Sequence, residues 1–194
     1  MTPAGIYLYG PEPESNNRVL RKYSKHHEYF IRVQFTDEDG LPVRYNSEVS
    51  NELIYTRFRK VLNEGIGIAG RQFAFLGFSH SSLRTQSCWF VAPFIENETL
   101  LHDRMLIQGL GDFSNIRCPA KCAARIGQAF SDTPSAITLD PGVIKQMDDV
   151  KRNGRVSSDG VGTVSASLLK KTHDALPRAK GSRPTLLQIR YSGM

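Results

Sequence analysis

Hydrophobic and polar residues alternate most regularly between residues 29 and 35. A period of two is typical of a strand with one buried face, so this stretch predicts a half-buried β-strand. Residues 50–65 show a helical period instead, with Ser50 or Asn51 as the cap and Gly65 as the stop. This second pattern predicts an amphipathic helix whose apolar face carries Leu53, Ile54, Phe58, Val61 and Leu62.

The middle of the chain contains two segments rich in aromatic and β-branched residues, at positions 66–78 and 88–92. They predict two strands, which the polar residues 79–87 join through a loop or a short helical turn. A helix is predicted at residues 119–130, because Pro119 suits the first turn of a helix. Its predicted inward-facing residues are Ala123, Ala124, Ile126, Ala129 and Phe130.

The other patterns are shorter. Residues 1–17 are rich in Pro, Gly, Glu and Asn, and they predict an extended segment with one short strand at residues 6–9. Residues 18–25 suit a helical turn or a loop. A helix is predicted at residues 99–109, and a short helix is predicted at residues 143–147.

Two strand-like segments lie near the end of the chain, at residues 161–165 and 186–191. Glycine reaches backbone angles that other residues avoid, so Gly160 and Gly162 predict a sharp turn at the first segment. Asp159 is predicted to stabilise this turn through a hydrogen bond from its side chain to the backbone.

Together these elements predict an α+β fold with mixed helices and strands. We expect three regions: an extended segment at residues 1–28, an α+β region at residues 29–144, and a third region at residues 145–194.

Charge separates the last region from the rest of the chain. The formal net charge is +6, and residues 1–144 contain 15 basic and 15 acidic side chains. Residues 145–194 contain 10 basic and 4 acidic side chains, so this region carries the whole excess. A basic surface favours a polyanionic partner, because phosphates gain from Coulomb attraction and counterion release. A solvated basic surface without such a partner explains the charge equally well.

The three cysteines, Cys88, Cys118 and Cys122, are an odd number, and no secretory leader is visible at the N-terminus. We therefore expect an intracellular chain, in the nucleus or the cytoplasm. Cys118 and Cys122 lie four residues apart, but zinc usually takes four ligands and no fourth ligand stands at a familiar spacing, so two small buried thiols at these positions are the simpler interpretation. No apolar run approaches the length that spans a bilayer, and no membrane segment is expected.

Several short motifs, in order along the chain, resemble one known family. They are Asn17–Arg21, Phe30–Glu38, Gly70–Ser79, Leu83-Arg84, Trp89-Phe90, Gly111–Phe113, Lys121–Ser131 and the two terminal blocks Ser157–Ser165 and Gln188–Gly193. The pattern is similar to that of the cellular RNA-dependent RNA polymerases of RNA silencing. The resemblance implies that residues 145–194 form the first strands of an incomplete double-psi β-barrel, which opens the catalytic core.

The resemblance also implies an activity, the copying of single-stranded RNA into double-stranded RNA from nucleoside triphosphates with Mg²⁺. The implied partners are single-stranded RNA and the remainder of the polymerase core. The family's metal-binding Asp-x-Asp-Gly-Asp loop is absent from these 194 residues, and Met194 stands where the family continues into a Lys-Gly pair. We therefore expect no catalytic residue, no metal and no cofactor in this chain. A non-catalytic RNA-binding or scaffold remnant of such a polymerase is the alternative.

The candidate RNA-binding residues are basic or amide side chains. Arg71 and Arg84 flank the predicted strand, loop and strand of the middle block, and guanidinium groups suit phosphate. Residues 121, 125 and 128 share one face of the predicted helix. Surface ion pairs for the arginines and an ordinary solvated face for the helix are the competing interpretations. The full candidate set is Arg71, Arg84, Lys121, Arg125, Gln128, Lys170, Lys171 and Arg190.

Overall fold

A computed structural model describes all residues except 11–16, 45–51, 133–136, 157, 159–161 and 177–194. The chain contains both helices and strands, which confirms the α+β class. It divides into two compact units, and the division falls between residues 133 and 134.

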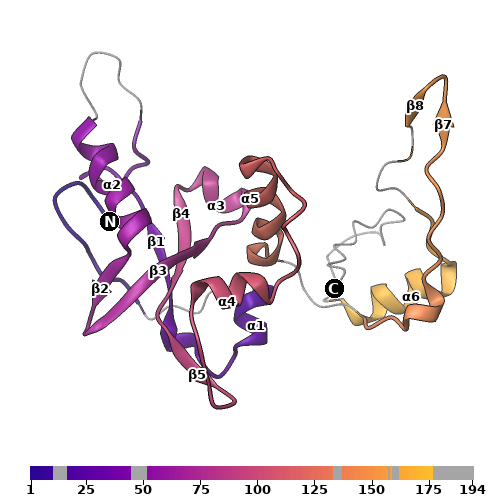
Figure 1. Ribbon diagram of the computed structural model, residues 1–194, viewed down its shortest axis with the longest axis horizontal. Helices are drawn as coiled ribbons and strands as arrows, with labels where there is room; N and C mark the ends of the chain where they lie inside the picture. The colour runs from indigo at the N-terminus through magenta and orange to yellow at the C-terminus, as the bar shows by residue number, and fades with distance from the viewer. Residues whose placement is uncertain (11–16, 45–51, 133–136, 157, 159–161, 177–194) are drawn as a thin grey trace. The chain divides into compact units, whose positions relative to one another are not determined.

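The first unit is built on a four-stranded antiparallel sheet with the order β1-β4-β3-β2 (Figure 1). The strands are β1 (Phe30–Gln34), β2 (Ile66–Ile68), β3 (Arg71–Gly77) and β4 (Ser87–Val91). In the central pairing, Val33 faces Cys88 across β1 and β4, and Phe75 faces Phe90 across β3 and β4. The predicted strand at residues 29–35 is confirmed by β1.

The single strand predicted at residues 66–78 is wrong, because the chain folds there into the hairpin of β2 and β3. Ala69 and Gly70 form its two-residue turn, with φ values of 49° and 75°. Two consecutive positive φ values are the signature of the turn type whose twist matches a β-hairpin. Gly70 is a turn signal in the sequence, but the apolar residues continue on both sides of it, and this continuous run indicated a single strand.

The two faces of the sheet are covered by different elements. One face packs against α1 (Arg18–Lys22), α4 (Asp103–Gln108) and η2 (Gln128–Phe130), while α2 (Glu52–Glu64) covers the other. Strand β4 is buried on both faces, because Trp89 and Val91 join the first cluster and Cys88 and Phe90 join the second. The helix predicted at residues 50–65 is confirmed by α2, and Gly65 ends it with a φ of 82°.

Two glycines allow a close approach where α5 (Pro119–Gly127) and the 3₁₀ turn η2 pack against the end of β3 and the residue after it. A Cβ atom on Gly127 would approach the carbonyl oxygen of Phe78 to 2.6 Å, and a Cβ on Gly77 would overlap the ring of Phe130. The helix predicted at residues 119–130 is present, as an α-helix to Gly127 and one 3₁₀ turn after it. Ala124 was predicted to face inward, but it is exposed.

Other elements of the first unit differ from the sequence predictions. The polar link at residues 79–87 contains the short helix α3 (His80–Arg84), which confirms the helical-turn alternative. Residues 99–109 begin with strand β6 (Thr99–Leu101), which pairs with β5 (Phe94–Glu96), so a helix over the whole range is wrong. Residues 6–9 contain no strand.

The second unit contains η3 (Pro141–Val143), the hairpin of β7 (Lys151–Arg152) and β8 (Arg155–Val156), and helix α6 (Ala166–Ala175). The predicted short helix at residues 143–147 is replaced by the single 3₁₀ turn η3. No strand occupies residues 162–165, where one was predicted, and Ser165 instead caps α6. The strand predicted at residues 186–191 lies outside the described residues.

The 3₁₀ helix η1 (His27–Tyr29) completes the elements of the described chain. Among the described residues, none of the helices is both long enough and apolar enough to cross a membrane.

Candidate nucleic-acid interface

Helix α5 displays a row of polar side chains on its exposed side. Lys121, Arg125 and Gln128 are all exposed. Gln128 is the C-cap of α5 and keeps helical backbone angles, so the spacing of four and three residues places all three on one face. The opposite side is fixed by Gly127, which packs against the backbone of Phe78. We call Lys121, Arg125 and Gln128 the α5 basic face.

The charges of the α5 basic face are available to a partner. Within the described part of the chain, neither Lys121 nor Arg125 has an ion-pair partner. From residue 121 to residue 128 a helix rises about 10 Å. Two cations and an amide along such a length suit the phosphates of an extended nucleic-acid strand.

Arg71 is held by the protein itself. Its guanidinium lies 4.3 Å from the centre of the Tyr29 ring, and its Nη1 donates a hydrogen bond of 3.0 Å to the carbonyl oxygen of Glu28. These contacts connect the start of β3 to the chain just before β1, which gives Arg71 a structural role. Arg84 lies in the last turn of α3 and is exposed.

The remaining candidates belong to the second unit or lie outside the described residues. Lys170 and Lys171 are exposed on α6. Gly162 is described, and a Cβ atom there would meet open space, so its surroundings do not require glycine. Arg190, Asp159 and Gly160 lie outside the described residues.

The acidic clusters of the chain serve local turns. Asp37 Oδ1 accepts a hydrogen bond from the backbone N–H of Glu38, and Asp39 Oδ1 accepts one from that of Leu41. Asp149 Oδ1 accepts a hydrogen bond from the hydroxyl of Ser158. In the part of the chain that the structure describes, no three His, Cys, Asp or Glu side chains gather closely enough to hold a metal ion. These residues do not fit the pair of Mg²⁺ ions that a nucleotidyl transfer would use.

The cysteines occupy different environments. Cys88 is buried in β4, and this burial raises the pKa of its thiol to about 12. Cys122 is half-buried, and Cys118 is exposed at the start of α5. The prediction of two buried thiols is therefore wrong for Cys118, and Cys122 is only partly buried.

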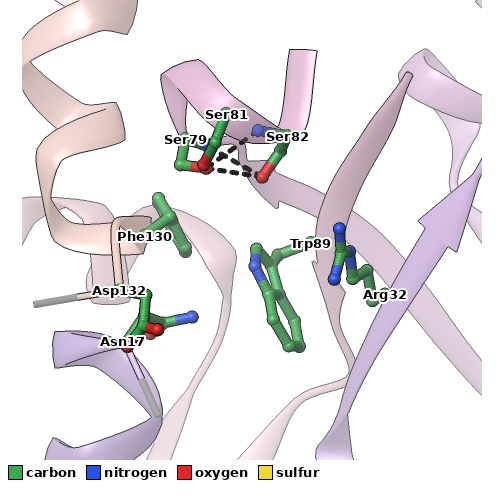
Figure 2. Close-up of a pocket in the computed structure, with 8 residues that line it drawn as sticks. All are labelled: Asn17, Arg32, Ser79, Ser81, Ser82, Trp89, Phe130 and Asp132. Atoms are coloured by element: carbon green, nitrogen blue, oxygen red, sulfur yellow. Dashed lines mark hydrogen bonds between the residues drawn. The ribbon is translucent and has the colours of Figure 1, made fainter. Parts of the chain in front are cut away.

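Sequence reasoning also missed two polar residues. Asn17 and Arg32 line a cavity together with Trp89, although they belong to separate elements (Figure 2). Each was visible only as part of a family-like motif, because no local spacing connects α1, β1 and β4.

All 194 residues, from 1 to 194, match the family model described as RNA-dependent RNA polymerase. The chain belongs to the RNA-dependent RNA polymerase family. The resemblance of its motifs to these eukaryotic polymerases is thereby confirmed.

Curated relatives agree with this assignment. The chain is 39% identical over 203 residues to RNA-dependent RNA polymerase 1 of Arabidopsis thaliana, an alignment that covers 100% of this chain and 18% of that protein. It is 33% identical over 210 residues to RNA-dependent RNA polymerase 6 of the same plant, covering 100% of this chain and 17% of the relative. RNA-dependent RNA polymerase 1 of Schizosaccharomyces pombe is 33% identical over 189 residues, with coverage of 92% and 15%. The chain thus spans less than a fifth of the length of these three relatives.

Proposed function

We propose that this chain is the part of an RNA-directed RNA polymerase that leads into and opens the catalytic core. In this proposal the complete enzyme copies single-stranded RNA into double-stranded RNA for RNA silencing, inside the cell and with Mg²⁺ as its metal. The observation that carries the proposal is the match of the family model to all 194 residues. The third region, residues 145–194, would supply the first strands of a double-psi β-barrel that the remainder of the polymerase core completes.

Within this function, we assign the α5 basic face to the RNA strand. Phosphate contacts position a nucleic acid without reading its sequence, as a template channel requires. Lys121 and Arg125 carry charges that no described residue neutralises. Lys170, Lys171 and Arg190 would add basic charge from the second unit and from the end of the chain.

The assignment of the α5 basic face is tested by fluorescence anisotropy with a labelled single-stranded RNA at several salt concentrations. The variant Lys121→Gln/Arg125→Gln removes two cations from the face. If both contact phosphates, the slope of log affinity against log salt falls by about 1.4, since each single-strand contact contributes about 0.7.

The matched control is Arg59→Gln/Lys60→Gln on α2, which removes the same charge from two other exposed positions. We expect this control to leave the salt slope near that of the unchanged chain. Equal slopes for the two double variants would show that only net charge matters and would remove the assignment of α5.

The 194-residue chain should not polymerise RNA by itself, because its sequence has no aspartate loop to hold the metal ions. The measurement is incorporation of labelled nucleotide on a single-stranded RNA template with Mg²⁺. Template-dependent product above a control without protein would contradict this expectation.

A further inference from the structure

The β7–β8 hairpin of the second unit concentrates positive charge in six residues. Its strands are Lys151–Arg152 and Arg155–Val156, drawn in orange in Figure 1. Lys151, Arg152 and Arg155 are all exposed, and residues 151–156 contain no acidic side chain. None of the candidate RNA-binding residues named above lies in this hairpin.

Arg152 and Arg155 stand side by side at the tip of the hairpin. They are directly opposite each other in the antiparallel register, and only Asn153 and Gly154 separate them in the chain. Both turn residues have positive φ, 50° and 74°, the signature of a turn whose twist matches the strands. Directly opposite residues point to the same face with Cβ atoms about 4.5–5.5 Å apart. The two guanidinium groups therefore share one face, and Lys151 belongs to the other.

The charges of this arginine pair are not neutralised within the described part of the chain. Neither Arg152 nor Arg155 has an ion-pair partner there. The nearest acidic residues in the sequence are Asp148 and Asp149, and Asp149 accepts a hydrogen bond from the hydroxyl of Ser158. An extended chain covers about 10 Å from residue 149 to residue 152. This distance is about one Debye length, so any attraction across it is weak.

The arginine pair opposes the folding of its own hairpin. Like charges directly opposite each other destabilise a β-ladder, and a two-stranded hairpin is already marginal in water. This ladder has only two residue pairs, Lys151 with Val156 and Arg152 with Arg155. A local conflict of this kind, without a visible compensating contact, is typical of a functional site.

Charge on an exposed strand also has a simpler role, since it prevents pairing with other chains. Lysine serves that role well, whereas both residues of this pair are arginine. A guanidinium group is planar and presents its N–H donors as a fork that matches the oxygens of a phosphate. The choice of residue therefore favours binding of a phosphate over simple protection of the strand.

The base of the hairpin is closed by one serine. The Ser158 hydroxyl accepts a hydrogen bond of 2.6 Å from the backbone N–H of Val150 and donates one of 3.1 Å to Asp149 Oδ1. These contacts join the residues before β7 to the residue that follows β8 by two positions. The hairpin is thus fixed at its base, and its tip presents the arginine pair.

We propose that Arg152 and Arg155 together hold a phosphate of the RNA backbone. A phosphate between the two guanidinium groups accepts charge-assisted hydrogen bonds from both and removes their mutual repulsion. Such a contact positions a strand without reading its sequence. The choice of RNA as the source of the phosphate rests on the proposed function. Single-stranded and double-stranded RNA share this phosphate chemistry, so the experiment separates them.

The first experiment measures the binding of labelled single-stranded RNA to the 194-residue chain by fluorescence anisotropy at several salt concentrations. In Arg152→Gln/Arg155→Gln, the slope of log affinity against log salt should fall by about 1.4, and the affinity at 0.1 M salt should fall about twenty-fold. This variant also removes the repulsion across the ladder, so a loss of binding would not result from unfolding of the hairpin.

The matched control is Arg59→Gln/Lys60→Gln, which removes the same charge from exposed positions of α2. We expect the control to bind RNA nearly as the unchanged chain does. Equal losses in the two double variants would overturn the proposal, because net charge alone would then explain the binding.

A second variant separates the guanidinium fork from its charge. Arg152→Lys/Arg155→Lys keeps both charges but cannot donate two parallel hydrogen bonds to a phosphate. We expect the salt slope to stay the same and the affinity to fall about three-fold or more. RNA binding equal to that of the unchanged chain would reduce the hairpin to a general basic surface and reject the site.

The second experiment locates the contact and its source by NMR. The backbone amide signals of residues 151–156 are followed while single-stranded RNA, or duplex RNA of the same length, is added. Saturable shifts with only one of them assign that form, and equal shifts assign a backbone contact that both forms make. If neither RNA moves these signals, the proposal is wrong even if RNA binds elsewhere on the chain.

The same titration distinguishes this site from the α5 basic face. If Lys121→Gln/Arg125→Gln leaves RNA binding unchanged while the hairpin signals still shift, the assignment of α5 fails and the hairpin site stands. If RNA binding depends on α5 and the hairpin does not respond, the hairpin site fails and the proposed function stands.

Discussion

The two units of the chain differ in where their apolar side chains lie. In the first unit, strand β4 is buried on both faces, and Phe90 is 0% exposed. In the second unit, no described residue is buried, and Val143, Met147 and Val150 are more than half exposed, at 66%, 68% and 61%. Burial of apolar surface is the main favourable term in folding, so the first unit has its own source of stability.

The β7–β8 hairpin and α6 in the second unit are held by interactions between residues that are close in the sequence. Asn153 and Gly154, with φ values of 50° and 74°, form the two-residue turn between β7 and β8. The Ser165 hydroxyl accepts a hydrogen bond from the backbone N–H of Leu168 and caps α6. Hairpins and ten-residue helices are marginal in water without a packed face. We propose that the remainder of the polymerase core provides the missing cover.

The largest expected effect compares apolar truncations in the two units. Phe90→Ala should lower the free energy of unfolding by about 3–5 kcal/mol, because it leaves a cavity in the cluster between the sheet and α2. Met147→Ala should change it by less than about 0.5 kcal/mol, since that side chain is exposed. Urea unfolding followed by Trp89 fluorescence measures both. Equal losses would mean that the second unit shares the core of the first.

A smaller effect is expected from substitutions that add a single Cβ atom. Alanine favours a helix over glycine by about 1 kcal/mol, but a Cβ on Gly127 would lie 2.6 Å from the carbonyl oxygen of Phe78. Gly127→Ala should therefore destabilise the chain by about 2 kcal/mol in urea unfolding. Gly142→Ala in the second unit meets open space and should be neutral within about 0.5 kcal/mol. A stabilising Gly127→Ala would show that α5 does not pack closely on the chain near β3.

The thiol of Cys88 reports on the core of the first unit through pH. Burial raises its pKa from 9.0 to about 12, so the unfolded chain loses this proton at lower pH than the folded chain. Stability should therefore fall as pH rises from about 9 toward 12, with a loss of about 1.4 kcal/mol between pH 8 and pH 10. Urea unfolding of the unchanged chain and of Cys88→Ala at both pH values isolates this contribution. The same pH dependence in both proteins would contradict it.

The smallest expected effect is confined to the second unit. Ser165→Ala removes the cap of α6 and should cost about 1 kcal/mol of local helix stability. Hydrogen exchange should become faster in Ala166–Ala175, while exchange in β4 and the global unfolding transition stay unchanged. Ser165→Asp retains a capping oxygen and serves as the control. Protection of α6 equal to that of β4 before any substitution would show that the second unit has a core after all.

Periodicity predicted the elements whose environment is simple. Ile31, Val33 and Phe35 alternate along the chain and join the cluster that α2 covers, as the pattern predicts, although Phe30 joins the cluster on the other side of the sheet. α2 contributes Phe58, Ile54 and Val61 to that cluster from one side. β4 is buried throughout, which a continuous apolar run also indicates. The Asn153-Gly154 pair is a turn signal in the sequence. The strands beside it are only two residues long, so no alternating pattern indicated a hairpin there.

The candidate interface was predicted in part. The exposure of Lys121, Arg125 and Gln128 agrees with the helical spacing. The partner of Arg71 could not be predicted, because Tyr29 reaches it only after β1 and β3 pair with the two edges of β4. Ala124 is exposed for a related reason, since the contact of Gly127 with Phe78 fixes which side of α5 faces the sheet.

By itself, the sequence determined the family, the α+β class, the strand at β1, the helix at α2 and the concentration of positive charge after residue 144. These properties depend on composition and on patterns between near neighbours. Only the tertiary structure decided that Asn17, Arg32 and Trp89 line one cavity and that Gly127 approaches Phe78. Such contacts join segments that are distant in the chain, and their geometry is set by the packing of helices on a twisted sheet, which no local pattern encodes.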